Sequence, residues 1–122
     1  MYTVASAREA LAALLPTLDQ IVALRADTAE LAAAVTSGAA TTLGGTPEFK
    51  AAQARLDELI TELQQHDVQV KGLAPLLLDF PSELDGVPVL LCWLEGDRAL
   101  GWYHRTDLGF AGRRPIPAGL LT

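Results

Sequence analysis

The chain has 122 residues, half of them apolar, and a net charge of −6 from nine basic and fifteen acidic side chains. This length fits one domain, here residues 1–122. The acidic balance argues against a nucleic-acid binder, which usually carries a basic face. The single cysteine, Cys92, excludes an internal disulfide and a cysteine-rich zinc module.

The N-terminal stretch is short and apolar but does not match a secretory signal. Arg8 and Glu9 interrupt it where such a signal is uncharged. The chain also lacks an apolar run of the length, about 18 residues, that spans a bilayer. With a single unpaired cysteine, these features predict a soluble, cytoplasmic protein that does not contact membranes.

The first half of the chain predicts two helices. Thr3 is the expected N-cap of a helix from Val4 to about Val35, in which leucines recur at spacings of three and four. Pro16 removes one backbone hydrogen bond there, but the apolar stripe keeps its phase, which favours one kinked helix over two. These residues form the first arm of a helical hairpin over residues 4–66.

The second predicted helix has clearer boundaries. Thr46 is the expected N-cap and Pro47 the first helical residue, and the helix runs to His66. Its apolar residues form a heptad-like seam that packs against another helix. A glycine-containing loop over residues 36–46 joins the two arms.

The pattern changes to β-structure over residues 67–122. A short strand is expected near Val68–Lys71, Asp85-Gly86 is a turn, and two strands form a hairpin over 87–105 around Gly96-Asp97. The tail from Asp107 is expected to be irregular. We therefore predict an α+β fold, a long antiparallel helical hairpin followed by a small antiparallel β-sheet.

A two-residue turn in this hairpin places Glu95 opposite Arg98 and fixes which residues share a face. One face then carries Trp93, Trp102 and His104, and the other carries Cys92 among apolar neighbours. Neither face is polar, although a sheet with one solvated side alternates apolar and polar residues. We therefore expect a homodimer in which a second copy covers one face. The alternative is that the first helix or the C-terminal tail covers it.

Several segments resemble one known family. The string LLLDFPSELDGVPVLLCWLEGD, the later GWYHRTDLGFAGRRP and the opening TVASAREALAALLP are similar to the bacterial domain of unknown function 2203 family. The resemblance implies a small stand-alone bacterial protein and supplies no reaction. Two positions depart from the family pattern: Gly72 follows Lys71 where an acidic residue is common, and Leu76 stands where glycine is usual.

Several side chains of the chain are of the types that bind metal ions, among them Cys92 and His104. No spacing matches a structural zinc site. In the predicted register Cys92 and His104 lie on opposite faces, so one chain does not join them at a metal. Of the possible metal ligands, His104 together with carboxylates is the best candidate. A metal site shared between the two subunits of a dimer is the other possibility. Cys92 itself is expected to be a buried, unreactive thiol.

The remaining candidates are polar residues in apolar surroundings. His104 beside Trp93 and Trp102 suggests a site for a flat ligand, although a lone histidine at a strand end often only makes a hydrogen bond. Asp79 is expected to precede a bend, partly buried and paired with an arginine such as Arg105. A catalytic carboxylate is the alternative role for Asp79.

The GFAGRRP segment holds the only local excess of positive charge. Arg113 and Arg114 with two glycines could bind a phosphate or carboxylate. The alternatives are a solvated tail or an arginine that pairs with a partner subunit.

The sequence contains no phosphate loop, dinucleotide fingerprint or hydrolase motif. We therefore expect a non-enzymatic, self-associating assembly or interaction module. The alternative is a small-molecule-binding or metal-binding protein, or an enzyme, that uses the Trp93/Trp102/His104 face with Arg113 or Asp79. The sequence identifies neither a cofactor nor a ligand.

Overall fold

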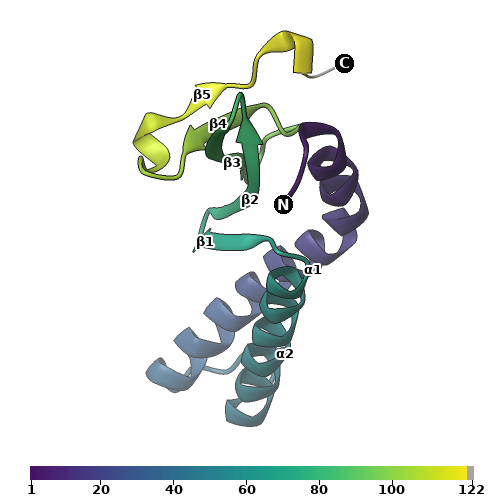
Figure 1. Cartoon of the computed structure of the whole chain (residues 1–122). Helices are drawn as coiled ribbons and strands as arrows, with labels where there is room; N and C mark the ends of the chain where they lie inside the picture. The colour runs from purple at the N-terminus through teal and green to yellow at the C-terminus, as the bar shows by residue number, and fades with distance from the viewer. Residues whose placement is uncertain (121–122) are drawn as a thin grey trace. The chain divides into compact units, whose positions relative to one another are not determined.

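The computed structural model describes residues 1–120 and has an α+β fold, in which two helices precede a five-stranded antiparallel sheet (Figure 1). This confirms the predicted fold class. Neighbouring strands pair in chain order. The elements are α1 Val4–Ser37, α2 Thr46–Gln65, β1 Gln69–Leu73, β2 Leu76–Leu84, β3 Val87–Leu94, β4 Trp102–Arg105 and β5 Arg114–Pro115.

Helix α1 begins at the predicted cap and is continuous through Pro16. The backbone N–H of Ser6 donates to Oγ1 of Thr3 at 3.0 Å, and the N–H of Thr3 donates to Oγ of Ser6 at 2.9 Å. These reciprocal bonds satisfy two amides at the helix start that lack helical partners. The prediction of one helix across Pro16 is confirmed.

Helix α2 begins one residue earlier than predicted. Thr46 is already helical, and the N–H of Gly45 donates to Oε1 of Glu48 at 2.9 Å. The carboxylate of Glu48 therefore caps this end, where it also faces the positive end of the helix dipole. Leu56, Leu59 and Leu63 of the predicted seam are buried.

The chain divides into two compact units. One contains residues 15–62, and the other contains residues 1–14 together with the chain from residue 63 onward. In the first unit, Leu18, Ile21 and Leu31 of α1 are buried, as are Leu56 and Leu59 of α2. The first turns of α1 belong to the unit that contains the sheet.

Strand β2 runs without a break through Asp79, where the sequence predicted a bend. Asp79 pairs with Gln69 of β1 on one side and with Cys92 of β3 on the other. The bend lies at the predicted Asp85-Gly86 turn, where φ is +51° and +78°. Two consecutive positive φ angles suit a tight hairpin whose twist matches the strands.

The predicted register between β3 and β4 is wrong by one residue. Leu90 lies opposite His104 and Cys92 lies opposite Trp102, and β4 begins at Trp102 rather than Ala99. The turn does not close on a Glu95–Arg98 pair. Instead, the N–H of Glu95 donates to the carbonyl of Leu76 at 2.8 Å, and the N–H of Asp97 donates to that of Leu94 at 2.8 Å.

A one-residue change in register moves every side chain of a strand to the other face. Trp102 and His104 therefore share a face with Asp79 and Cys92, and we call this side the His104 face. The opposite side, the Phe80 face, carries Trp93. The His104 face comprises Leu77, Asp79, Leu90, Cys92, Trp102 and His104, and the Phe80 face comprises Leu78, Phe80, Val89, Leu91 and Trp93.

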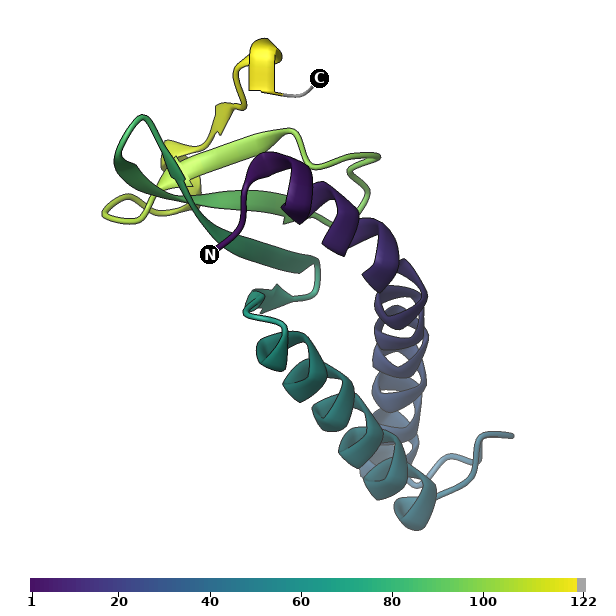
Figure 2. The ribbon, with the colours of Figure 1, turned by 45° about the vertical axis from the view of Figure 1, so that its right-hand side comes forward.

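The first turns of α1 cover the Phe80 face (Figure 2). The ring of Tyr2 packs edge-on against Phe80 with centroids 5.4 Å apart, and Phe80 and Leu91 are fully buried. The Tyr2 hydroxyl also donates to the carbonyl of His66. One of the two segments considered as cover, the first helix, thus covers this face.

The C-terminal tail lies over the His104 face. It is more ordered than predicted, since it contains β5 and two short 3₁₀ turns, Phe110–Gly112 and Ala118–Leu120. Ile116 is buried, and its N–H donates to the carbonyl of Gly101 at 2.9 Å. The last two residues of the predicted tail lie outside the described residues. Both segments that cover the sheet come from the same chain.

Candidate functional site

Three neighbouring strands bring the polar residues of the His104 face together. Asp79 on β2 lies opposite Cys92 on β3, and His104 on β4 lies opposite Leu90 on β3. Strand β3 separates β2 from β4, so the side chains of Asp79 and His104 must extend over it to meet. The width of β3 therefore determines how far apart the backbones of Asp79 and His104 lie.

Asp79 and His104 form a buried polar pair. Nε2 of His104 lies 3.3 Å from Oδ2 of Asp79, and their side chains are 6% and 2% exposed. The partner of Asp79 is thus a histidine, and not one of the arginines expected from the sequence. Arg105 instead donates through Nε to Asp107 at 2.9 Å on the surface.

The second ring nitrogen of His104 determines where a proton lies in this pair. Nδ1 is 2.9 Å from the carbonyl oxygen of Arg105, which can only accept, so Nδ1 carries a hydrogen. A hydrogen bond between Nε2 and Oδ2 then requires a second proton, on one of these two atoms. An imidazolium with a carboxylate satisfies it, and so does a neutral imidazole with a carboxylic acid. In both arrangements the other oxygen of Asp79, Oδ1, is an acceptor.

That second oxygen is the unusual atom of the pair. Oδ1 of Asp79 is buried and has no hydrogen-bond partner among the described residues. A buried polar atom without a partner costs about 1–3 kcal/mol, so such atoms are rare and call for an explanation. A group that donates to Oδ1 would remove this cost.

Cys92 lies beside Asp79 and is fully buried. Burial raises the pKa of the Cys92 thiol, the neighbouring carboxylate of Asp79 also raises it and the nearby Arg113 lowers it, and the net pKa is about 12. The thiolate is the nucleophilic and metal-binding form of cysteine. Cys92 therefore remains a protonated, unreactive thiol near neutral pH.

A pocket of about 480 Å³ opens above the Asp79–His104 pair. Its charged lining residues besides the pair are Lys71 and Asp107, and its apolar walls come from β2, β3 and the tail. The segment over it, residues 106–110, is exposed throughout. The lining consists of Lys71, Leu77, Asp79, Leu90, His104, Thr106, Asp107, Leu108, Gly109 and Phe110.

Arg113 attaches the tail to the same face of the sheet. Its guanidinium carbon lies 4.4 Å from the ring centre of Trp102 and 4.5 Å from that of Phe110. Such cation–π contacts stabilise by about 0.5–1 kcal/mol at partly exposed sites. Nη1 of Arg113 is buried without a hydrogen-bond partner among residues 1–120. The stack holds Phe110 at the pocket rim.

Of the predicted binding residues, Trp102 and Arg113 contact Phe110 or its stack without lining the pocket, and Trp93 and Arg114 do not line it either. Trp93 lies on the Phe80 face, so the expected Trp93/Trp102/His104 surface does not form, because the true register puts Trp93 on the other side. Its indole N–H donates to the carbonyl of Asp97 at 3.1 Å. Arg114 lies opposite Tyr103, so the alternation of β5 directs it away from Arg113.

The backbone of the GFAGRRP segment is already hydrogen-bonded within itself. The N–H of Gly112 donates to Gly109 at 2.8 Å, and that of Arg113 donates to Phe110 at 3.1 Å. These two amides are therefore not directed at a bound anion.

The described part of the chain contains no group of three or more His, Cys, Asp or Glu side chains placed to hold a metal ion. His104 is engaged through both nitrogens, as described above. Within the same residues, none of the helices has the length and apolar character needed to cross a membrane.

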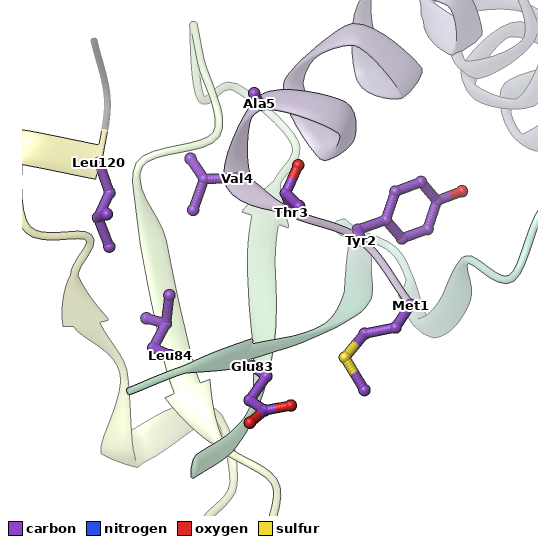
Figure 3. A pocket seen from close by; sticks show the side chains of 8 residues that line it. All are labelled: Met1, Tyr2, Thr3, Val4, Ala5, Glu83, Leu84 and Leu120. Atoms are coloured by element: carbon purple, nitrogen blue, oxygen red, sulfur yellow. The ribbon is translucent and has the colours of Figure 1, made fainter. Parts of the chain in front are cut away.

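A second depression, of about 360 Å³, lies beside the N-terminus (Figure 3). It is lined by residues 1–5, by Glu83 and Leu84 near the end of β2, and by Leu120. Among these lining residues, Glu83 has the one side chain that is charged at neutral pH, and none of the candidates predicted from the sequence lines the depression.

The sequence contained a usable signal for the Asp79–His104 pair. Asp79 interrupts an otherwise apolar strand, and a carboxylate there needs a partner of opposite charge or a proton. His104 occupies the equivalent position in its own strand. The assumed turn hid the relation, because it placed His104 on the wrong face.

The comparison with known families agrees with the resemblance noted from the sequence. A family described as "Uncharacterized conserved protein (DUF2203)" matches residues 1–116. The chain belongs to this family. No curated protein and no solved structure matches the chain. Membership in DUF2203 assigns no activity, so function has to be argued from the site.

Proposed function

We propose that this DUF2203 protein binds a small polar molecule in the pocket above Asp79 and His104. The observation that carries the proposal is the buried, unpartnered Oδ1 of Asp79 at a pocket of about 480 Å³. Small-molecule sites are commonly about 300–1,000 Å³, with apolar walls and a few convergent polar groups. The mixture of leucines, Phe110 and one buried polar pair fits that description.

Binding fits the geometry better than catalysis. A general base needs a nitrogen or oxygen free to accept a proton from the substrate. His104 has neither nitrogen free, because one faces a carbonyl and the other faces Asp79. The thiol of Cys92 is protonated at neutral pH and is not a nucleophile. We therefore assign His104 a positioning role, in which it binds Oδ2 of Asp79 and leaves Oδ1 without a partner in the described chain.

The test is a two-dimensional ¹H–¹⁵N NMR screen of the full chain against small anionic, cationic, neutral and zwitterionic molecules. The amides of Leu108, Gly109 and Phe110 report on the pocket, and that of Gly38 between the helices is a remote reference. We expect saturable shifts at the pocket amides. A screen in which no molecule moves them at millimolar concentration would overturn the proposal.

A blocking variant separates binding from fold stability. A side chain added at Gly109 meets no atom within 4 Å, and φ there is −86°, so Gly109→Leu fits the backbone and places a bulky group at the rim. Gly119→Leu is the matched control, because it also meets open space and does not line this pocket. We expect Gly109→Leu to abolish the shifts and Gly119→Leu to retain them.

Self-association is a second candidate, and exposed apolar side chains in the helical hairpin support it. Leu15, Val35 and Leu43 are 45%, 42% and 37% exposed. We propose that the chain forms a homodimer through exposed apolar side chains of its helical hairpin. Light scattering after size exclusion tests this: a dimer that Leu15→Glu converts to a monomer supports it, and a monomer at all concentrations excludes it.

We also propose a cytoplasmic location, which rests on the single buried thiol of Cys92. Cell fractionation with a compartment marker tests this directly.

A further inference from the structure

The charges that line the pocket are partly cancelled by pairs within the chain. Asp107 is bound by Arg105 through two nitrogens. Oδ2 of Asp79 is taken by His104. Among the ionisable side chains of the described lining, this leaves one acceptor without a partner, Oδ1 of Asp79, and one cation at the rim, the exposed Lys71, which makes no ion pair with them.

The ligand must therefore supply complementary groups at its two ends. Oδ1 is an acceptor whichever atom of the pair carries the shared proton, so the ligand must donate a hydrogen bond there. A charged N–H donor gives the stronger bond to a carboxylate. The ammonium of Lys71 has only donors, so it favours an anionic group.

Besides the exposed hydroxyl of Thr106, the remaining side chains that line the pocket are apolar and set the third requirement. Leu77, Leu90 and Leu108 line the walls, and Phe110 lies at the rim, 42% exposed. Burying an apolar group of the ligand against these side chains removes both surfaces from water. An aliphatic or aromatic group on the ligand meets this requirement.

We infer that the ligand class is a zwitterion with an apolar side chain, an α-amino acid or a close analogue. Its ammonium donates to Asp79, its carboxylate pairs with Lys71 and its side chain packs against the leucines and Phe110. This inference rests on the proposed function, since it names the ligand of the same pocket.

Three probes of the same carbon skeleton separate the requirements. L-leucine carries both charged groups, 3-methylbutylamine lacks the carboxylate, and 4-methylpentanoate lacks the ammonium. Titrations followed by NMR shifts at Leu108, Gly109 and Phe110 give the dissociation constants. We expect each truncated probe to bind at least about tenfold more weakly than leucine, because each loses one charge-assisted contact.

Two variants assign the contacts to residues. Lys71→Gln removes the rim cation from an exposed position and should weaken leucine about tenfold while leaving 3-methylbutylamine unchanged. Lys50→Gln, an exposed lysine on α2, is the matched control and should change neither. Asp79→Asn should weaken leucine and the amine but not 4-methylpentanoate. If Asp79→Asn does not fold, the Lys71 comparison still decides the carboxylate contact, and the three probes decide the ammonium contact.

The possible results distinguish this inference from the proposed function. Equal affinity for leucine and one truncated probe would overturn the zwitterion class and leave the pocket a binding site. The zwitterion class would also be wrong, and the pocket still a binding site, if none of the three probes shifts the pocket amides while another molecule of the broader screen does. If nothing in either experiment moves them, both proposals are wrong.

Discussion

The two faces of the sheet are buried in different ways. The Phe80 face is apolar and is closed by the first turns of α1, with Phe80 and Leu91 fully buried. The His104 face buries an aspartate, a histidine and a thiol beneath a tail whose residues 106–110 are all exposed. Burial of apolar groups stabilises a fold, whereas burial of ionisable groups seldom does. The contrast indicates that one face supports the fold and the other forms the site.

The largest expected effect is the loss of packing on the Phe80 face. Phe80→Ala removes a fully buried ring, and such truncations cost about 3–5 kcal/mol of unfolding free energy. Phe110→Ala makes the same change on the His104 side at a ring that is 42% exposed, and we expect it to cost about 1 kcal/mol or less. Urea denaturation of the two variants measures both values. Equal costs would contradict the division of roles.

The second prediction concerns the buried pair. His104→Leu leaves Asp79 buried without its partner, and breaking such a pair costs about 3–5 kcal/mol. The double variant Asp79→Leu/His104→Leu removes both polar groups, so we expect it to be more stable than the single variant by about 1–3 kcal/mol. It should nevertheless lose the ligand-induced NMR shifts, since the acceptor is gone.

The double variant also tests the alternative that the pair only supports the fold. In that case the double variant would be less stable than the native chain, whereas a pair that mainly serves binding predicts a double variant at least as stable as the native chain. Denaturation curves with equal m-values make the comparison valid, because equal m-values show that the same surface is exposed on unfolding.

The helical half of the chain could be predicted from sequence because its signals are local. The cap at Thr3 and the leucine spacing each act within one or two turns, and even Pro16 did not obscure the pattern. The strand Val87–Leu94 and the turn at Asp85-Gly86 were predicted for the same reason. Apolar periodicity predicts these elements without any information about long-range contacts.

The candidate site depended on a long-range contact and was therefore only partly predicted. The sequence selected Asp79, His104 and Trp102 individually, but their arrangement follows from the β3–β4 register. Glu95 sets that register by bonding with Leu76 on β2, both through its own N–H and through Oε1, which accepts from Leu76 at 2.9 Å. The sequence pattern of β3 and β4 alone does not reveal these bonds, because their partner lies on β2.

The third prediction uses the thiol under the His104 face. The pKa of Cys92 is about 12 in the folded chain against 9.0 as the ordinary value, so the folded state holds the proton more tightly than the unfolded state. This contribution to stability is complete below pH 9 and is lost as the pH rises toward 12. The loss amounts to about 1.4 kcal/mol for each pH unit in that window.

Cys92→Ala isolates that contribution, since tyrosines and lysines titrate in the same range in both proteins. We expect the unfolding free energy of the native chain to fall more steeply above pH 9 than that of the variant. Folded protein should also resist alkylation by iodoacetamide at pH 8, while urea-unfolded protein reacts readily. Rapid labelling of the folded chain would contradict the burial of this thiol.

The smallest predicted effect tests whether the tail over the His104 face can loosen without unfolding the sheet. Arg113→Ala removes the stack between Trp102 and Phe110 and should cost about 1 kcal/mol. Because the tail segment is exposed and the Phe80 face is covered by α1, hydrogen exchange should accelerate at Gly112 and Arg113 and stay unchanged at Leu91. Arg114→Ala, a neighbouring arginine outside the stack, is the control and should alter neither. Uniform acceleration through β3 would instead mean that the two faces unfold as one unit, and that the tail contributes to the core as much as α1 does.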